Sequence, residues 1–262
     1  MFNQFINTLI SASFTVWLYM SVLFIVSIII KRNDIADVAW GIGFVVASLT
    51  GLIFNQNTSF PAVLVFGLVL LWGARLSLHI GRRNLKKSED FRYKVKRDSW
   101  GRWFLIRSYF QIFILQGVLL LIIVSPALLI STYAHGGVTL LLSIATLIWV
   151  FGFVFEVIGD SQLAKFLKDQ KNKGHVMQNG LWGYTRHPNY FGEVTLWWAI
   201  GIIAASYRYG LLGFIGPAVI TYLILKVSGI PMLEEKNSNK PEYIAYKRKT
   251  SMFIPLPAKN IY

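Results

Sequence analysis

Cysteine is absent from this 262-residue sequence, which excludes both a disulfide framework and a zinc–thiolate site. Acidic residues are scarce, since 12 Asp and Glu stand against 26 Lys and Arg and leave a formal net charge of +14. Metal-binding spacings such as His-x-x-His do not occur, so we expect no metal site. Gly-x-Gly-x-x-Gly and Walker loops are also missing, so any nucleotide would not be bound by a Rossmann or P-loop domain.

Charged residues are also few, and apolar residues take their place. The charged fraction is 15% and the hydrophobic fraction is 55%, whereas soluble domains typically have about 25% charged and about 45–50% apolar residues. In a soluble chain the excess of basic residues would point to nucleic acid as a partner. Here the apolar content points to an integral membrane protein instead, with membrane lipids and no nucleic acid as partners.

Long apolar segments recur along the whole chain. A helix needs about 20 mostly apolar residues to cross the hydrocarbon core of a bilayer. Seven segments meet this condition: 11–30, 36–55, 59–80, 104–131, 138–159, 190–206 and 209–231. We therefore predict an all-α integral membrane protein with seven transmembrane helices in a single transmembrane domain, 1–262.

Basic residues alternate between the segments that connect these spans. Lys and Arg are concentrated in the segments 31–35, 81–103, 160–189 and the tail after 231. The turns 56–58 and 132–137 contain none, and the turn 207–208 contains Arg208. Because cytoplasmic loops carry the excess of Lys and Arg, this alternation predicts an outer N-terminus and a cytoplasmic C-terminus.

Residues 180–193, GLWGYTRHPNYFGE, carry the densest group of hydrogen-bonding side chains. Arg186 is a permanent, fork-shaped donor suited to phosphate, and Pro188 fits the first turn of a helix. A purely structural interpretation is an interfacial belt, in which Trp and Tyr lie at the depth of the headgroups and the Arg side chain snorkels toward water. An amide and a carboxylate at the same helix start, Asn189 and Glu193, favour a functional interpretation.

The run Arg-His-Pro-Asn-Tyr-Phe-Gly-Glu resembles the C-terminal signature of bacterial membrane relatives of steroid 5α-reductase. With Trp-Gly before it, the run is also similar to the sterol C14- and Δ7-reductases, whose motif ends in Asp. The resemblance includes Glu156 and Asp160 upstream and a Tyr-x-x-Tyr…Phe-x-Pro tail downstream. It covers roughly residues 150–258 well and the first 100 loosely.

This resemblance implies NADPH as the cofactor, bound from the cytoplasmic side of a bacterial inner membrane. Helices in 1–135 would face the substrate, and helices in 136–262 would bind the cofactor. The positions that match cofactor-binding residues, or lie in the corresponding basic loop, are Glu156, Asp160, Arg186, His187, Asn189, Tyr190, Glu193, Tyr246, Arg82, Arg83, Asn84 and Arg92.

The catalytic acid is less well defined by the sequence. Steroid 5α-reductases place a Gln-Glu pair on an early helix and a tyrosine near the position of Ile80, and this sequence has neither. Asp37 at the start of the second predicted span is a candidate acid, although a helix-start Asp is also a normal dipole partner. Tyr93 and Tyr190 are the other candidates for the group that polarises a substrate carbonyl.

These features predict an NADPH-dependent reductase of a C=C bond in an apolar substrate, such as a 3-oxo-Δ4-steroid-like enone or a related lipid. Isoprenylcysteine and phospholipid methyltransferases are an alternative, because they share Arg-His-Pro-x-Tyr, a Glu-Glu pair like Glu234-Glu235 and a similar tail. Their cofactor is S-adenosylmethionine. A small transporter or assembly factor is a third possibility, but the sequence shows no symmetry between halves. The oligomeric state is left open.

Overall fold

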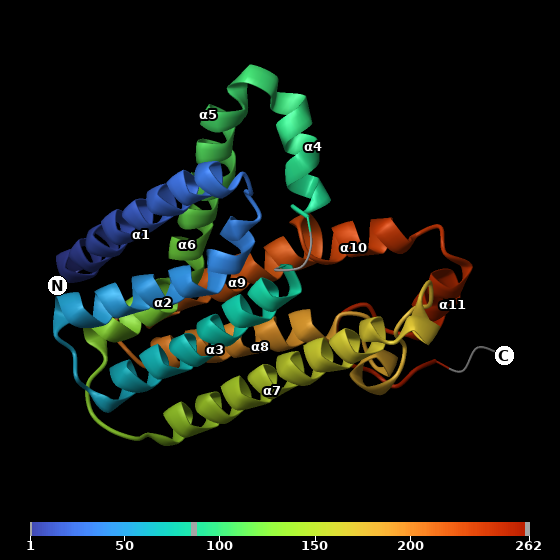
Figure 1. Ribbon diagram of the computed structural model, residues 1–262. Coiled ribbons are helices and arrows are strands. Elements are labelled where there is room, and N and C mark those ends of the chain that lie inside the picture. Colours follow the sequence, from blue (N-terminus) through green and yellow to red (C-terminus); the bar gives the residue numbers. More distant parts are fainter. Residues whose placement is uncertain (1, 85–87, 260–262) are drawn as a thin grey trace. The chain divides into compact units, whose positions relative to one another are not determined.

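The computed structural model describes residues 2–84 and 88–259, and within these ranges the regular structure is helical (Figure 1). The one β-type contact in the described residues is an isolated bridge between Thr185 and Ser251. The all-α prediction is therefore confirmed. The chain forms two compact units, which are described separately: Met1–Thr139 with Ala204–Gly216, and Leu140–Ile203 with Pro217–Tyr262.

The first unit contains three long helices followed by an interrupted fourth. The interrupted part passes from α-helix through a 3-10 turn and a π-helical stretch back to α-helix. The elements are α1 (Phe2–Ile30), α2 (Ile35–Asn55), α3 (Phe60–Asn84), α4 (Phe91–Trp100), η1 (Gly101–Trp103), α5 (Phe104–Ser108), η2 (Tyr109–Ile114), α6 (Leu115–Tyr133) and η5 (Gly210–Phe214).

The second unit is built on one long helix and the C-terminal helices. Its elements are α7 (Leu140–Lys168), η3 (Gln170–Asn172), η4 (Gly180–Gly183), most of α8 (Pro188–Ala205) and of α9 (Ile215–Tyr222), η6 (Leu223–Val227), α10 (Ile230–Asn237) and α11 (Pro241–Lys249). The largest fully buried side chains of this unit are Trp149, Trp197 and Tyr246.

Six helical segments of the described chain are long and apolar enough to cross a membrane: Phe2–Ile30, Ile35–Asn55, Phe60–Asn84, Arg92–Tyr133, Leu140–Lys168 and Gly210–Asn237. The remaining predicted span, 190–206, coincides with helix α8. The first six residues of this helix include Asn189 and Glu193, which lower its mean hydropathy. The structure also places helix α4 inside the predicted connecting segment 81–103.

Glycine pairs set the closest helix contacts in each unit. A Cβ added to Gly41 of α2 would lie 2.3 Å from the carbonyl oxygen of Gly73 in α3. In the second unit, a Cβ added to Gly192 of α8 would lie 2.5 Å from the carbonyl oxygen of Gly152 in α7. Because only glycine permits backbones to come so close, α7 and α8 lie in direct contact beside the residues of the candidate site.

Candidate functional site

The predicted segment 180–193 lies against the C-terminal residues of the second unit. The Thr185 hydroxyl donates to the carbonyl oxygen of Phe253 at 2.8 Å, and the Arg186 amide donates to the carbonyl oxygen of Ser251 at 2.9 Å. Thr185, Arg186 and His187 are all buried. The backbone therefore fixes the Arg-His-Pro run before helix α8 begins.

Glu234 of α10 is the centre of the polar contacts around this run. Its Oε1 atom accepts hydrogen bonds from Arg186 Nε at 2.8 Å and from the Tyr243 hydroxyl at 2.6 Å, and it lies 3.3 Å from His187 Nε2. Its Oε2 atom lies 3.2 Å from Lys247 Nζ. We call these five residues the Glu234 cluster: Arg186, His187, Glu234, Tyr243 and Lys247.

Arg186 is held entirely within the second unit by these contacts. Its side chain is 5% exposed, and that of Glu234 is 12% exposed. Its Nη1 atom donates to the carbonyl oxygens of Thr250 at 2.6 Å and Lys247 at 3.3 Å. The guanidinium is therefore paired with a carboxylate, and it connects the Arg-His-Pro run to α10 and to the end of α11. This position differs from the phosphate contact that the sequence predicts for Arg186.

Burial is the largest influence on the pKa values of His187 and Tyr243. It lowers the pKa of His187 below its ordinary value, although the hydrogen bond with Glu234 acts in the opposite direction. It also raises the pKa of Tyr243, and the neighbouring Glu234 carboxylate adds to that effect. At neutral pH the imidazole is therefore neutral and the phenol protonated, so both groups remain hydrogen-bond donors or acceptors rather than charges.

Three buried polar atoms beside this cluster have no hydrogen-bond partner among the described residues: His187 Nδ1, Asn189 Oδ1 and Thr250 Oγ1. The other end of the Asn189 amide donates to Asp160 Oδ1 at 3.1 Å. Buried polar groups nearly always find a partner, so such atoms need an explanation. A bound polar molecule would supply the missing partners.

The structure also locates the remaining predicted residues of the second unit. Tyr190 stacks on His187, with ring centroids 5.8 Å apart and an interplanar angle of 22°. Tyr246 is buried, and its hydroxyl donates to the carbonyl oxygen of Trp182. Glu156 is 2% exposed and lies one turn before Asp160 on α7, and Glu193 is half-buried in the second turn of α8.

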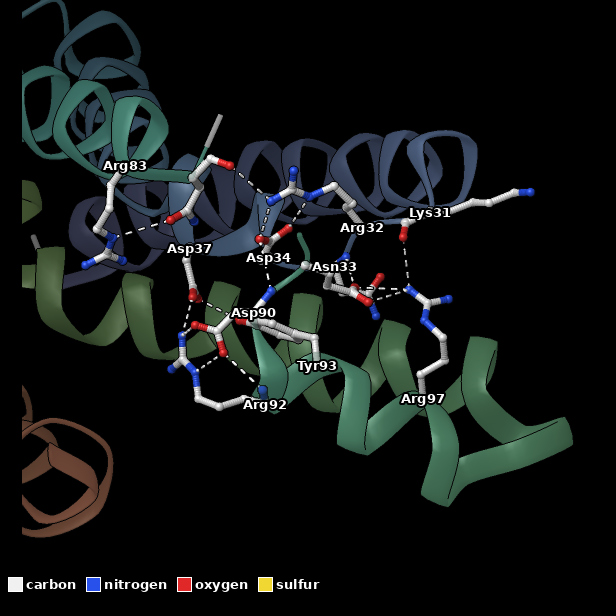
Figure 2. Close-up of polar contacts among 12 residues, drawn as sticks. Lys31, Arg32, Asn33, Asp34, Asp37, Arg83, Asp90, Arg92, Tyr93 and Arg97 are labelled. Atoms are coloured by element: carbon white, nitrogen blue, oxygen red, sulfur yellow. Dashed lines mark hydrogen bonds and ion pairs between the residues drawn. The ribbon is translucent and has the colours of Figure 1, made fainter. Parts of the chain in front are cut away.

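The first unit brings together three other predicted residues (Figure 2). Asp37 at the start of α2 accepts a hydrogen bond from Tyr93 at 2.6 Å and forms an ion pair with Arg92 Nη2 at 2.7 Å. Tyr93 is 5% exposed. The Asp37 side chain therefore lies between the Arg92 guanidinium and the Tyr93 hydroxyl.

Helix α4 is fixed at its start by Asp90, whose side chain caps the helix by accepting from the Arg92 amide at 3.0 Å. The Asp90 carboxylate also binds Arg92 Nε at 2.9 Å. Partial burial alone would raise the pKa of Asp90, but the hydrogen bonds and charge of Arg92 outweigh it and hold that pKa below its ordinary value. Asp90 therefore stays ionised.

Hydrogen bonds connect the α1–α2 turn to the residues just before α4, and ion pairs lie within the turn and between Glu89 and α4 (Figure 2). Arg32 binds Asp34 at 2.7 Å, and Arg97 binds Glu89 at 3.0 Å. Glu89 also accepts from the amide of Asn33 at 2.7 Å. Asn84 at the end of α3 joins this network, because its carbonyl oxygen accepts from Arg32 Nη2 at 3.4 Å. Arg82 and Arg83 are exposed, and Arg83 Nε donates to Asn84 Oδ1 at 3.4 Å.

Sequence reasoning missed the central position of Glu234. In the sequence the Glu234-Glu235 pair is only a similarity to methyltransferases. No local pattern indicates that Glu234 contacts an arginine 48 residues earlier. A glutamate close to the inner end of an apolar segment was the available indication, because such a charge needs a partner. No group of three metal-ligating side chains occurs in residues 2–84 and 88–259.

Comparison with known proteins places this chain in a family. Residues 23–250 match the family described as "Protein of unknown function (DUF1295)", and since this is most of the chain, the protein belongs to that family. An uncharacterized protein of Schizosaccharomyces pombe is 27% identical over 268 residues, which cover 90% of this chain and 76% of that protein. No solved structure matches the chain.

Proposed function

We propose that this member of the DUF1295 family is a membrane reductase that uses NADPH to saturate a C=C bond of an apolar enone or related lipid. The observation that supports it best is the group of unpartnered buried atoms at the start of α8, next to the Asp160–Asn189 pair. His187, Asn189 and Asp160 are also positions that the resemblance to the steroid 5α-reductase relatives assigns to the cofactor.

The chemistry of these residues suits a dinucleotide. Asn189 Oδ1 is an acceptor for an amide or hydroxyl donor, while Thr250 Oγ1 can both donate and accept. His187 Nδ1 is an acceptor, because the neutral ring uses its one N–H at Nε2 toward Glu234. Since Arg186 is already neutralised by Glu234, positive charge for phosphates would come from exposed residues of α11, above all Lys247, which is 59% exposed.

The bound cofactor would supply a hydride to the β-carbon of the substrate, and a proton at the α-carbon completes the reduction. The residues of this chain must then bind the carbonyl oxygen and stabilise the negative charge that develops on it. We assign this role to the Tyr190 hydroxyl, because Tyr190 belongs to the same unit as the cofactor residues. The hydroxyl of Tyr93, the other tyrosine candidate, already donates its one hydrogen to Asp37.

The proposed topology follows the distribution of charge. Seven transmembrane helices, with α8 as the sixth, would place the N-terminus outside and the basic segments in the cytoplasm of a bacterial inner membrane. The residues of the Glu234 cluster belong to segments that are predicted on that inner side. The same holds for Asp37, Arg92 and Tyr93. NADPH, a cytoplasmic molecule, would then bind without crossing the bilayer.

The direct test is thermal stabilisation of the full chain in detergent, because a ligand that binds the folded state raises its unfolding temperature. We expect NADPH to stabilise the wild type and to lose this effect in Asn189→Ala. Asn237→Ala removes an exposed amide of the same unit and serves as the matched control. Stabilisation by S-adenosylmethionine and none by NADPH would reject the proposal.

A second experiment addresses the phosphate contact. If Lys247 binds the 2′-phosphate, Lys247→Ala weakens NADPH binding but leaves NADH binding almost unchanged. Lys240→Ala removes another exposed lysine and should affect neither cofactor. Equal losses for NADPH and NADH in Lys247→Ala would remove Lys247 from this role.

A lipid or isoprenyl methyltransferase is the second candidate function, and one observation favours it. The buried ion pair between Arg186 and Glu234 connects the Arg-His-Pro run to the Glu-Glu pair, the two motifs shared with those methyltransferases. S-adenosylmethionine has no phosphate, so it does not need a free arginine at this position. The stabilisation experiment above discriminates the two functions directly.

A further inference from the structure

A cavity of about 410 Å³ lies within the first unit, away from the polar groups described so far. It is lined by the first half of α1, by α6 and by η5 with the residue after it, through side chains such as Phe5, Leu9, Leu121 and Leu212. Ligand pockets typically measure about 300–1,000 Å³, and a water molecule takes about 30 Å³. The cavity therefore has the size and the apolar lining of a site for an organic molecule.

Two serines interrupt this apolar lining, Ser13 of α1 and Ser125 of α6. Ser125 Oγ of α6 lines the cavity and has no hydrogen-bond partner among the described residues. The next residue, Pro126, has no N–H, so the carbonyl of Ile122 lacks the donor that a helix normally provides. Ile122 also lines the cavity. One wall thus combines an available donor with a carbonyl acceptor on the same turn of α6.

We propose that this cavity binds a membrane lipid alcohol, a molecule with a long apolar body and one hydroxyl group. A hydroxyl accepts one hydrogen bond and donates another, so it can accept from Ser125 and donate to the Ile122 carbonyl. A pure hydrocarbon would leave the Ser125 hydroxyl without a partner, which is costly in an apolar site. The walls belong to candidate membrane spans, so such a molecule enters from the bilayer.

This site is separate from the contacts among Asp37, Arg92 and Tyr93 in the same unit. Ser13 is the lining residue of α1 nearest to the α1–α2 turn, and α1 continues for 17 residues, from 13 to 30, before it ends. At about 1.5 Å per residue this is roughly 26 Å. The alcohol group at Ser125 therefore belongs to a second site, and its occupation does not depend on the proposed reductase activity.

Photolabelling of the full chain in lipid nanodiscs tests the proposal, with a hexadecanol that carries a diazirine in its chain as the probe. We expect labelled peptides from α1 and α6, and we expect unlabelled hexadecanol to compete at least fivefold better than hexadecane. Ser125→Ala should weaken labelling by roughly fivefold, the effect of about 1 kcal/mol. Ser11→Ala removes a hydroxyl of α1 that does not line the cavity and should label as the wild type does.

Leu121→Trp provides an independent variant, because the larger side chain fills the cavity and should abolish labelling. An unchanged unfolding temperature confirms that this variant is folded, and unchanged stabilisation by NADPH separates the result from the proposed function. Equal competition by hexadecane, or full labelling of Ser125→Ala, would overturn the proposal and leave an apolar groove without preference for an alcohol.

Discussion

The Glu234 cluster makes a quantitative prediction, since one carboxylate compensates a buried cation. Glu234→Ala removes the acceptor of Arg186 Nε and of the Tyr243 hydroxyl at once. Arg186, at 5% exposure, cannot turn to water without breaking its bonds to the carbonyls of Thr250 and Lys247. Removing one partner of a buried pair typically costs about 3–5 kcal/mol, because the other charge stays buried and unpaired.

The assay is thermal unfolding in detergent, followed by circular dichroism. For a chain of this size 1 kcal/mol corresponds to roughly 2–4 °C, so the unfolding temperature should fall by about 6–20 °C. Glu234→Gln keeps the shape and one acceptor but loses the charge, and we expect about half of this loss. Glu235→Ala, the exposed neighbour on the same helix, is the matched control and should change the temperature little.

The double variant Arg186→Leu with Glu234→Ala provides the decisive comparison. The double variant contains no unpaired buried charge at this position, so it should be more stable than Glu234→Ala alone. Replacing a whole buried ion pair by apolar residues is often neutral or stabilising, whereas removing one partner is destabilising. If Glu234→Ala unfolds at the temperature of Glu235→Ala, the pair does not compensate a buried charge. If the double variant is less stable than both single variants, the reasoning on charge compensation is also wrong.

Three further outcomes follow from other contacts. Burial lowers the pKa of His187, so its contribution to stability is complete above about pH 6.5 and is lost as the pH falls below it; wild type should lose more thermal stability than His187→Gln between pH 7.5 and 5.5. Gly192→Ala should lower the unfolding temperature by forcing α7 and α8 apart, whereas Gly67→Ala, with open space at its Cβ, should not. Asp37→Ala should cost about 1–3 kcal/mol in denaturant unfolding, because Arg92 loses a charged partner; no change would refute that contact.

Most of the helices were predictable because membrane spans have a strong and local sequence pattern. The predicted spans 36–55 and 59–80 correspond closely to α2 and α3, and 11–30 covers the later part of α1, which begins at Phe2. Helix α4 was not predicted, since its composition is basic and polar. Its start is fixed instead by the Asp90 cap and by two contacts between residues about 55 apart in sequence. These run from the Asp90 amide to Asp34 and from Arg92 to Asp37, and no local pattern indicates them.

The residues of the candidate site were predictable in part from the sequence, but the contacts between them were not. Asn189 and Asp160 were predicted as site residues, but their contact depends on the close crossing of α7 and α8 at Gly152 and Gly192. That crossing arises from two glycines in separate helices, and a single sequence does not show which glycines meet. The inward orientation of Arg186 likewise requires Glu234, which joins the site only when the chain has folded.

Two groups of basic residues lie in different surroundings, arginines that pair with acidic side chains and exposed lysines of α11. Arg32, Arg92, Arg97 and Arg186 each form an ion pair with an acidic side chain. The lysines of α11 are placed differently, since Lys247 is 59% exposed although it touches Glu234. Interactions of exposed charges are screened by salt, whereas buried pairs are screened much less. Binding of an anionic cofactor should therefore weaken between 0.05 and 0.5 M salt, by an amount that Lys247→Ala reduces, while the unfolding temperature of the ligand-free protein stays nearly constant. A parallel fall of both quantities would place the arginine pairs, and not the exposed lysines, at the centre of anion binding.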